Sequence, residues 1–176
     1  MTKHYPHSQW KAIDTFHLTA FSFGSTAVST PLTIVILPVL ILGIVPAELK
    51  NTYLGLIGLV GLVASMIVQP VIGYISDRTL PFWGSRTPYI AIGSLLTCVA
   101  VFALGFAPTY LSLVLAMIAY QICINTALGP YQALIRDLAP RARRGLVSSF
   151  KILADTSGGA GFLALVAFLL GSYASP

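Results

Sequence analysis

Long stretches without a charged residue are the feature that most constrains the fold of this chain. No Asp, Glu, Lys or Arg occurs in residues 15–47, 51–76 or 87–135. About 20 consecutive apolar residues, rising about 1.5 Å each, cross the hydrocarbon core of a membrane as a helix. The first two stretches hold one such helix each. The third would form a helix of roughly 73 Å, which is too long for a single crossing.

The third stretch must therefore turn back on itself, and the sequence GFAPT at residues 105–109 marks the turn. One more apolar run follows the charged residues near position 140. The runs are continuous and do not alternate, which argues against the strands of an outer-membrane barrel. The sequence predicts an all-α membrane protein with five transmembrane helices and a polar tail at residues 1–15. The predicted spans are residues 16–44, 52–76, 88–106, 109–134 and 145–173.

Composition excludes several classes of protein. Charged residues make up 9% of the chain, 56% is apolar and the mean hydropathy is +0.86, whereas a soluble domain is about one quarter charged. We therefore expect a multi-pass protein of the plasma or inner membrane, with the lipid bilayer as its surroundings. The basic residues lie in short runs between spans, so no nucleic-acid partner is expected. Cys98 and Cys123 lack metal-ligand spacing, and no catalytic constellation or cofactor motif is present.

The basic residues are distributed unevenly between the two sides of the membrane. Under the five-span count nine of the ten lie on one side and only Lys50 lies on the other. The nine are Lys3, Lys11, Arg78, Arg86, Arg136, Arg141, Arg143, Arg144 and Lys151. Because Lys and Arg favour the cytoplasmic side, we predict a cytoplasmic N-terminus, cytoplasmic loops at 77–88 and 135–145, and a C-terminus on the outer side.

The loop after the second predicted span carries a recognisable motif within GYISDRTLPFWGSRTPY, residues 73–89. The pattern Gly-x-x-x-Asp-Arg, followed by Gly-x-Arg, resembles the signature loop of the major facilitator superfamily of secondary transporters. The matching residues are Gly73, Asp77, Arg78, Gly84 and Arg86. The inserted residues 79–83 and the Pro88-Tyr89 pair are similar to the sugar:cation symporter and sucrose-transporter branches. Ser85 replaces an arginine of that pattern.

A second motif lies after the fourth predicted span. Asp137, Pro140, Arg144 and Gly145 have the spacing acid-x-x-Pro-x-x-x-Arg-Gly, which is similar to the corresponding loop of sugar-type members. The resemblance implies that the charges of both loops close the cytoplasmic side of the transporter and separate when its halves rock. The alternative is that the arginines only set the orientation in the membrane.

The resemblance also implies a fold and a function. Members have two six-helix halves with the solute between them, so residues 16–176 would form an incomplete N-terminal half-bundle, either a fragment or a split half that needs a C-terminal half or second chain. The expected function is secondary active transport of a small, sugar-like solute by alternating access, driven by H⁺ or Na⁺. The alternative is a non-transporting assembly protein, such as a pigment-delivery relative, whose loop also ends in Pro-Tyr-Ile.

Polar residues within the spans are candidates for the solute site. Because the first and fourth helices of the family line its central cavity, one face of each is a candidate cavity wall. The candidates are Ser22, Thr26 and Thr30 in the first span and Gln121, Asn125 and Gln132 in the fourth. For both sets the alternative is packing between helices, since hydroxyl and amide groups also bond across helix contacts.

Asp155 is the one acid placed within the last apolar run, and two interpretations remain open. If the helix enters the membrane at Gly145, Asp155 lies about 15 Å deep and is a candidate for coupling a cation. If the span begins near residue 152, Asp155 lies one turn inside the membrane and pairs with Lys151, four residues earlier.

Overall fold

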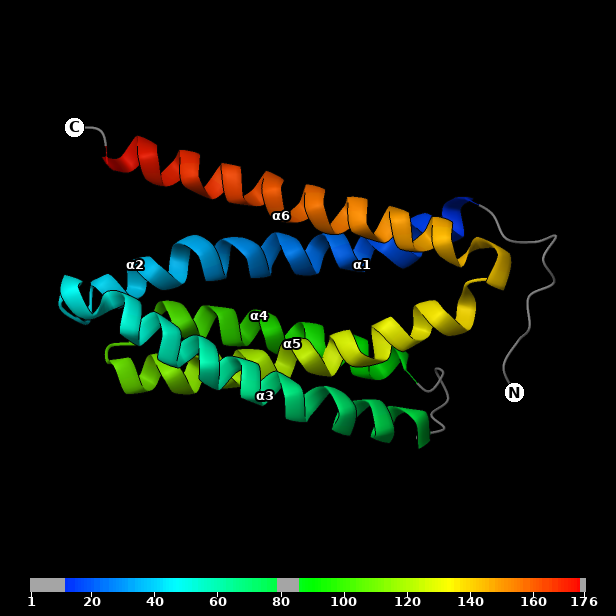
Figure 1. Cartoon of the computed structure of the whole chain (residues 1–176), viewed down its shortest axis with the longest axis horizontal. Coiled ribbons are helices and arrows are strands. Elements are labelled where there is room, and N and C mark those ends of the chain that lie inside the picture. The colour runs from blue at the N-terminus through cyan, green and yellow to red at the C-terminus, as the bar shows by residue number, and fades with distance from the viewer. Residues whose placement is uncertain (1–11, 79–85, 175–176) are drawn as a thin grey trace. The chain divides into compact units, whose positions relative to one another are not determined.

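The computed structural model describes residues 12–78 and 86–174 of the 176-residue chain. Within these ranges every regular element is helical (Figure 1). In chain order the elements are α1 (Ala12–Pro31), the π-helical turn η1 (Leu32–Ile36), α2 (Leu37–Leu42), the 3₁₀ turn η2 (Ala47–Leu49), α3 (Lys50–Arg78), α4 (Thr87–Gly105), α5 (Tyr110–Leu138), the 3₁₀ turn η3 (Arg141–Arg143) and α6 (Arg144–Ala174).

Five stretches of the described chain are long and apolar enough to cross a membrane. They are Leu18–Leu42, Ala47–Arg78, Thr87–Gly105, Tyr110–Leu138 and Arg141–Gly171. The prediction of an all-α membrane protein with five spanning helices is confirmed.

The helices extend further than the predicted spans at several ends. Helix α1 begins at Ala12, inside the stretch assigned to a tail. Helix α5 continues through Arg136 and Asp137 to Leu138, inside the stretch 135–145 that the sequence predicts to be a loop. The physical reason is that a charge ends the apolar crossing but does not end the helix, and an arginine in a last turn is favoured by the helix dipole.

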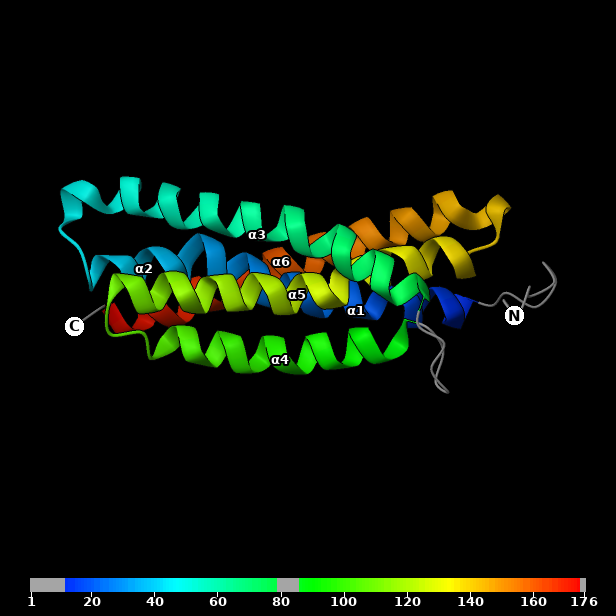
Figure 2. The same ribbon diagram turned by 90° about the horizontal axis from the view of Figure 1, so that it is seen from below.

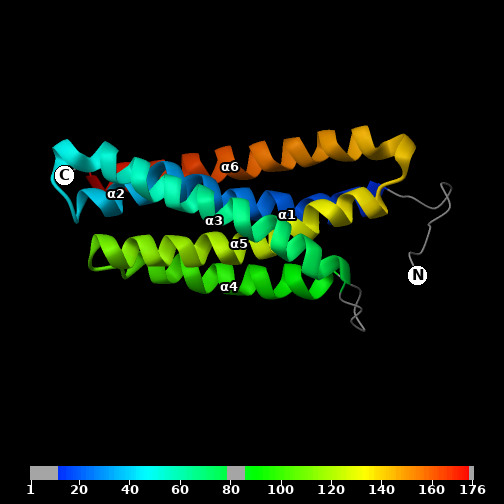
Figure 3. The same cartoon turned by 60° about the horizontal axis from the view of Figure 1, so that its bottom comes forward.

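The helices form two compact units. The terminal unit comprises residues 1–39 and 135–176, and within it α1 and α6 lie side by side and run in the same direction (Figures 1 and 3). The central unit comprises residues 40–134, and within it α4 lies along α5 while α3 crosses α5 (Figure 2).

A π-helical turn interrupts the first spanning helix between Pro31 and Pro38. Within this turn the Leu37 N–H donates to the carbonyl of Leu32, five residues back. Pro38 has no N–H, and its ring would press on the carbonyl of Ile34 in a regular α-helix. A wider turn before the proline relieves this clash.

The connection between α4 and α5 is short and fixed by local hydrogen bonds. The Thr109 N–H donates to Ser112 Oγ at 3.0 Å, and the Ser112 N–H donates to Thr109 Oγ1 at 3.2 Å. This reciprocal capping box satisfies two backbone donors at the start of α5.

Helices α4 and α5 pack closely along their length. A Cβ added at Gly93 of α4 would lie 2.7 Å from the backbone nitrogen of Ala127 in α5. The central unit therefore depends on glycine at this contact.

Candidate functional site

Asp77 and Arg86 of the first motif form an ion pair. Arg86 Nη2 donates to Asp77 Oδ1 at 2.8 Å. Asp77 lies in the last turn of α3 and Arg86 immediately precedes α4, so the pair joins the ends of two consecutive spanning helices. The Arg86 side chain is 13% exposed and that of Asp77 is 58% exposed. The guanidinium therefore lies against protein while the carboxylate faces outward.

The other residues of this motif have different surroundings. The guanidinium of Arg78 lies 4.2 Å from the ring centroid of Tyr74, one turn earlier on α3, in a cation–π contact. The carbonyl of Gly73 accepts a hydrogen bond from Ser76 Oγ at 2.9 Å. Gly84 lies outside the residues that the structure describes.

The second motif caps the end of α5. Arg144 Nη2 donates to the carbonyl of Arg136 at 2.9 Å, and its Nε donates to the carbonyl of Ala139 at 3.3 Å. These carbonyls belong to the last turn of α5 and to the residue that follows it, where helical partners are lacking. Asp137 is exposed in the same turn, and a Cβ at Gly145 would meet open space. Arg144 thus secures the turn between α5 and α6.

The hydroxyl-bearing face of α1 lies against α6 within the terminal unit. A Cβ added at Gly158 would collide with the carbonyl oxygen of Phe23 and lie 2.9 Å from Thr26 Oγ1. A Cβ added at Gly159 would lie 2.8 Å from Thr30 Oγ1. We call this contact the α1–α6 seam. It places Thr26 and Thr30 at a helix contact, which agrees with the packing interpretation of these residues.

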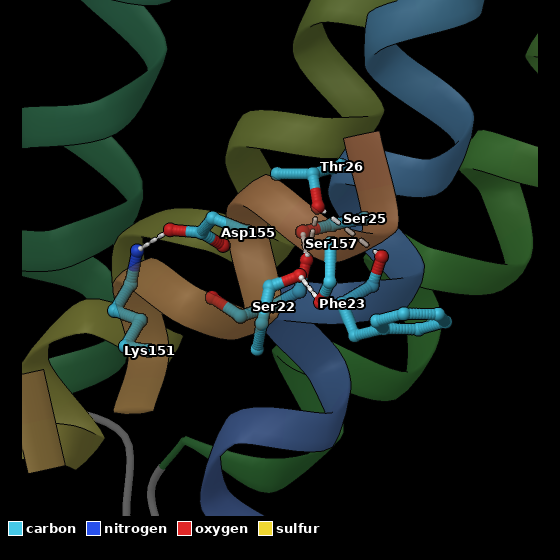
Figure 4. Close-up of polar contacts among 8 residues, drawn as sticks. Ser22, Phe23, Ser25, Thr26, Lys151, Asp155 and Ser157 are labelled. Atoms are coloured by element: carbon cyan, nitrogen blue, oxygen red, sulfur yellow. Dashed lines mark hydrogen bonds and ion pairs between the residues drawn. The ribbon is translucent and has the colours of Figure 1, made fainter. Parts of the chain in front are cut away.

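Hydroxyls of the seam bond to the backbone of their own helix. Thr26 Oγ1 donates to the Ser22 carbonyl at 2.9 Å, and Ser25 Oγ donates to the same carbonyl at 3.0 Å (Figure 4). Ser22 itself is 1% exposed. A role of Ser22, Thr26 or Thr30 in a solute cavity stays a prediction.

Asp155 forms an ion pair with Lys151 on α6. Lys151 Nζ lies 2.6 Å from Asp155 Oδ2, and the two side chains are 29% and 27% exposed (Figure 4). Since α6 already begins at Arg144, Asp155 lies three turns into the helix. The ion pair that the four-residue spacing of Lys151 and Asp155 predicts is therefore present, and it lies within an apolar helix.

Amide side chains join α3 to α5 in the central unit. Gln69 Nε2 donates to Asn125 Oδ1 at 2.7 Å, and Asn125 Nδ2 donates to Ser65 Oγ at 3.0 Å. Ser65 Oγ also lies 3.3 Å from Gln121 Oε1. Asn125 is 3% exposed. Its side chain bonds across the contact between α3 and α5, as the packing interpretation describes. Gln132 is exposed on the same helix, and a cavity role for all three residues stays a prediction.

Gln69 is a participant that the sequence interpretation missed. The sequence did contain an indication of its role, because an amide side chain within an apolar span is costly unless it is hydrogen-bonded. It also lies four residues from Ser65, and hence on the same helix face. Gly61 belongs to the same contact, since a Cβ there would lie 2.9 Å from Gln121 Nε2. In the described part of the chain no three His, Cys, Asp or Glu side chains gather in a metal-binding group.

Five apolar helices with charged loops at their ends define an integral membrane protein of the multi-pass helical type. Residues 20–175 match the family described as MFS/sugar transport protein. The chain belongs to this family, and the resemblance inferred from the two loop motifs is confirmed.

Three of the relatives that the chain matches are sucrose transport proteins of rice. The chain is 33% identical over 113 residues to sucrose transport protein SUT1 of Oryza sativa subsp. japonica. This match covers 52% of the chain and 21% of the relative. It is 37% identical over 59 residues to SUT5 of subsp. indica, covering 34% and 11%. It is 28% identical over 126 residues to SUT3 of subsp. indica, covering 57% and 25%. The matches thus span a quarter or less of each relative. No solved structure matches the chain.

Proposed function

We propose that this chain is the N-terminal part of a secondary active transporter for a sugar-like solute, working by alternating access in the plasma or inner membrane. Its relatives are named as sucrose transport proteins, which favours a disaccharide or similar polyol. The solute would lie between this half-bundle and a second one, supplied by a C-terminal half or another chain. An H⁺ or Na⁺ gradient would drive it, and no covalent chemistry is involved.

The observation that carries this proposal is the Asp77–Arg86 ion pair at 2.8 Å. It ties the end of α3 to the start of α4 with charges that lie at helix ends and not within the apolar spans. In a transporter of this family, such a pair can stabilise the conformation that is closed on this side. When the halves rock, water can hydrate the two charges in place of the ion pair. Asp137 and Arg144 would belong to the same side, and the excess of basic residues there favours a cytoplasmic position.

Uptake of radiolabelled sucrose into proteoliposomes tests the proposal. The gene would be expressed in its complete genomic reading frame, and uptake would be compared with protein-free liposomes under imposed H⁺ and Na⁺ gradients. We expect saturable uptake that unlabelled sucrose or a related sugar competes. If the uptake of every sugar in a panel of mono- and disaccharides equals that of protein-free liposomes, the transport proposal is contradicted and the assembly-protein alternative is favoured.

A further inference from the structure

Four arginines lie in the short segment that joins α5 to α6. We call this segment, residues 136–144, the arginine turn, and in Figure 1 it lies where the yellow end of α5 passes into α6. Its four positive charges and one negative charge, that of Asp137, give it a net charge of +3. The arginines are Arg136, Arg141, Arg143 and Arg144, and all four are exposed. The terminal unit therefore presents a concentrated positive charge at the end of a membrane span.

Hydrogen bonds hold the arginine turn in a closed shape. Arg144 Nη2 donates to the carbonyl of Arg136 at 2.9 Å, which joins the last residue of the turn to the first. The Arg143 N–H donates to the carbonyl of Pro140 at 2.8 Å within η3. The fold thus keeps the four charges within one small segment.

Arg136 and Arg141 are the members of the turn whose charges are most available. Both side chains are exposed, and neither takes part in an ion pair among the residues that the structure describes. Arg144, in contrast, uses its guanidinium to cap α5. Two guanidinium groups are therefore directed to the surroundings beside a capping residue that fixes the turn.

Exposed apolar side chains follow directly after the turn on α6. Leu146 is 53% exposed and Phe150 is 50% exposed, and their spacing of four residues puts them on one face. Phe150 lies about 9 Å along the helix from Arg144, while the headgroup layer of a bilayer is about 5–8 Å thick. One lipid can therefore place its headgroup at the turn and its acyl chains beside Leu146 and Phe150. A free phosphate ion would contact the turn alone.

We propose that the arginine turn binds the headgroup of an anionic phospholipid whose acyl chains lie along the exposed start of α6. Guanidinium groups keep their charge at physiological pH and donate paired hydrogen bonds to phosphate oxygens. Basic clusters that adjoin a spanning helix are typical of sites for anionic lipids. This surface needs no solute, so the inference goes beyond the proposed transport function and is independent of it.

Quenching of a tryptophan by brominated lipids tests this inference in the purified full chain. The reporter chain would carry Trp10→Phe, Trp83→Phe and Phe150→Trp, in nanodiscs with increasing fractions of phosphatidylglycerol or phosphatidylcholine brominated on the acyl chains. We expect half-maximal quenching at a mole fraction about tenfold lower for phosphatidylglycerol than for phosphatidylcholine. NaCl at high concentration should reduce this difference, because salt screens exposed charges.

Arg136→Gln/Arg141→Gln in the reporter chain should lower the difference between the two lipids to about twofold or less. Neither substitution changes Arg144, which caps α5. If the double variant does not fold, Arg141→Gln alone should lower the difference about twofold. Lys50→Gln is the matched control for the single variant, because it removes one lysine at the start of α3 and should leave the difference unchanged.

Three results would overturn the inference. Equal quenching by the two lipids in the reporter chain would leave the arginines with orientation in the membrane as their role. A preference for phosphatidylglycerol that neither arginine variant lowers would place the lipid elsewhere on the molecule. Inorganic phosphate, exchanged for chloride at equal ionic strength, should not change the preference. If it abolishes the preference, the turn binds phosphate ions and not a lipid. The measurement contains no sugar, so its outcome is separate from that of sucrose uptake.

Discussion

At the scale of single residues, the Asp77–Arg86 pair is asymmetric. The guanidinium is 13% exposed and the carboxylate 58% exposed. An ion pair with one partner in solvent contributes little to folding, about 0–1 kcal/mol. Its position is more informative than its strength, because it joins the two helix ends at which the family motif lies. We therefore predict that the pair acts on the balance between conformations and not on the stability of the fold.

Asp77→Asn should separate these two roles. The neutral amide keeps the size of the side chain but removes the charge that attracts Arg86. We expect the sucrose uptake rate to fall about fivefold or more, as for a coupling of about 1 kcal/mol between states, while the unfolding temperature changes little. Proteoliposome uptake and thermal unfolding of the same preparation measure both quantities.

The control for Asp77→Asn is Glu48→Gln, which neutralises an exposed acid in η2. Glu48 lies just before the first residue of α3, at the end of that helix opposite to Asp77. We expect its uptake to equal that of the natural chain. If Asp77→Asn transports as well as Glu48→Gln, the ion pair has no part in gating.

At the scale of elements, the α1–α6 seam depends on glycine. Gly158 lies so close to α1 that a side chain there would meet the Phe23 carbonyl, which is backbone and cannot rotate away. Gly161, three residues later, has no atom of another element within 4 Å of an added Cβ. The two glycines lie on one helix and yet have opposite surroundings, which allows a paired experiment.

Gly158→Ala should loosen the seam, whereas Gly161→Ala should not. Overpacking a close helix contact costs about 1–3 kcal/mol, while alanine in an open helical position gains up to about 1 kcal/mol over glycine. Thermal unfolding in nanodiscs should therefore place Gly158→Ala below the natural chain and Gly161→Ala at or above it. Equal unfolding temperatures for the two variants would show that α1 and α6 are not in close contact.

The same seam shows how far the sequence could be interpreted. Spacing alone showed that Ser22, Thr26 and Thr30 share a face, and that Gln121 and Asn125 share another. It could not show which helix each face meets, because every span in a membrane is apolar and pairing follows from local shape. Gly158 against Phe23 and Gly93 against Ala127 are matters of shape. The charge-free lengths, in contrast, act on each segment separately, and they predicted the five helices.

At the scale of the whole molecule, charge asymmetry governs orientation. Nine of the ten basic residues fall on one side when the helices are counted in order, and Lys50 falls on the other. Glu48 precedes α3 and Arg141 lies in η3, before α6, so the two residues mark opposite membrane sides of this count. Both are exposed, which makes them suitable positions for a chemical label.

Cysteine labelling in intact cells tests the cytoplasmic N-terminus. In a background with Cys98 and Cys123 replaced by serine, Glu48→Cys should react with a membrane-impermeant maleimide added outside. Arg141→Cys should react only after the membrane is permeabilised, because the positive-inside rule predicts that the η3 segment lies in the cytoplasm. Permeabilised cells, in which both positions should react, control for reactivity. Labelling of Arg141→Cys but not Glu48→Cys in intact cells would reverse the orientation, and would move the Asp77–Arg86 pair to the outer face.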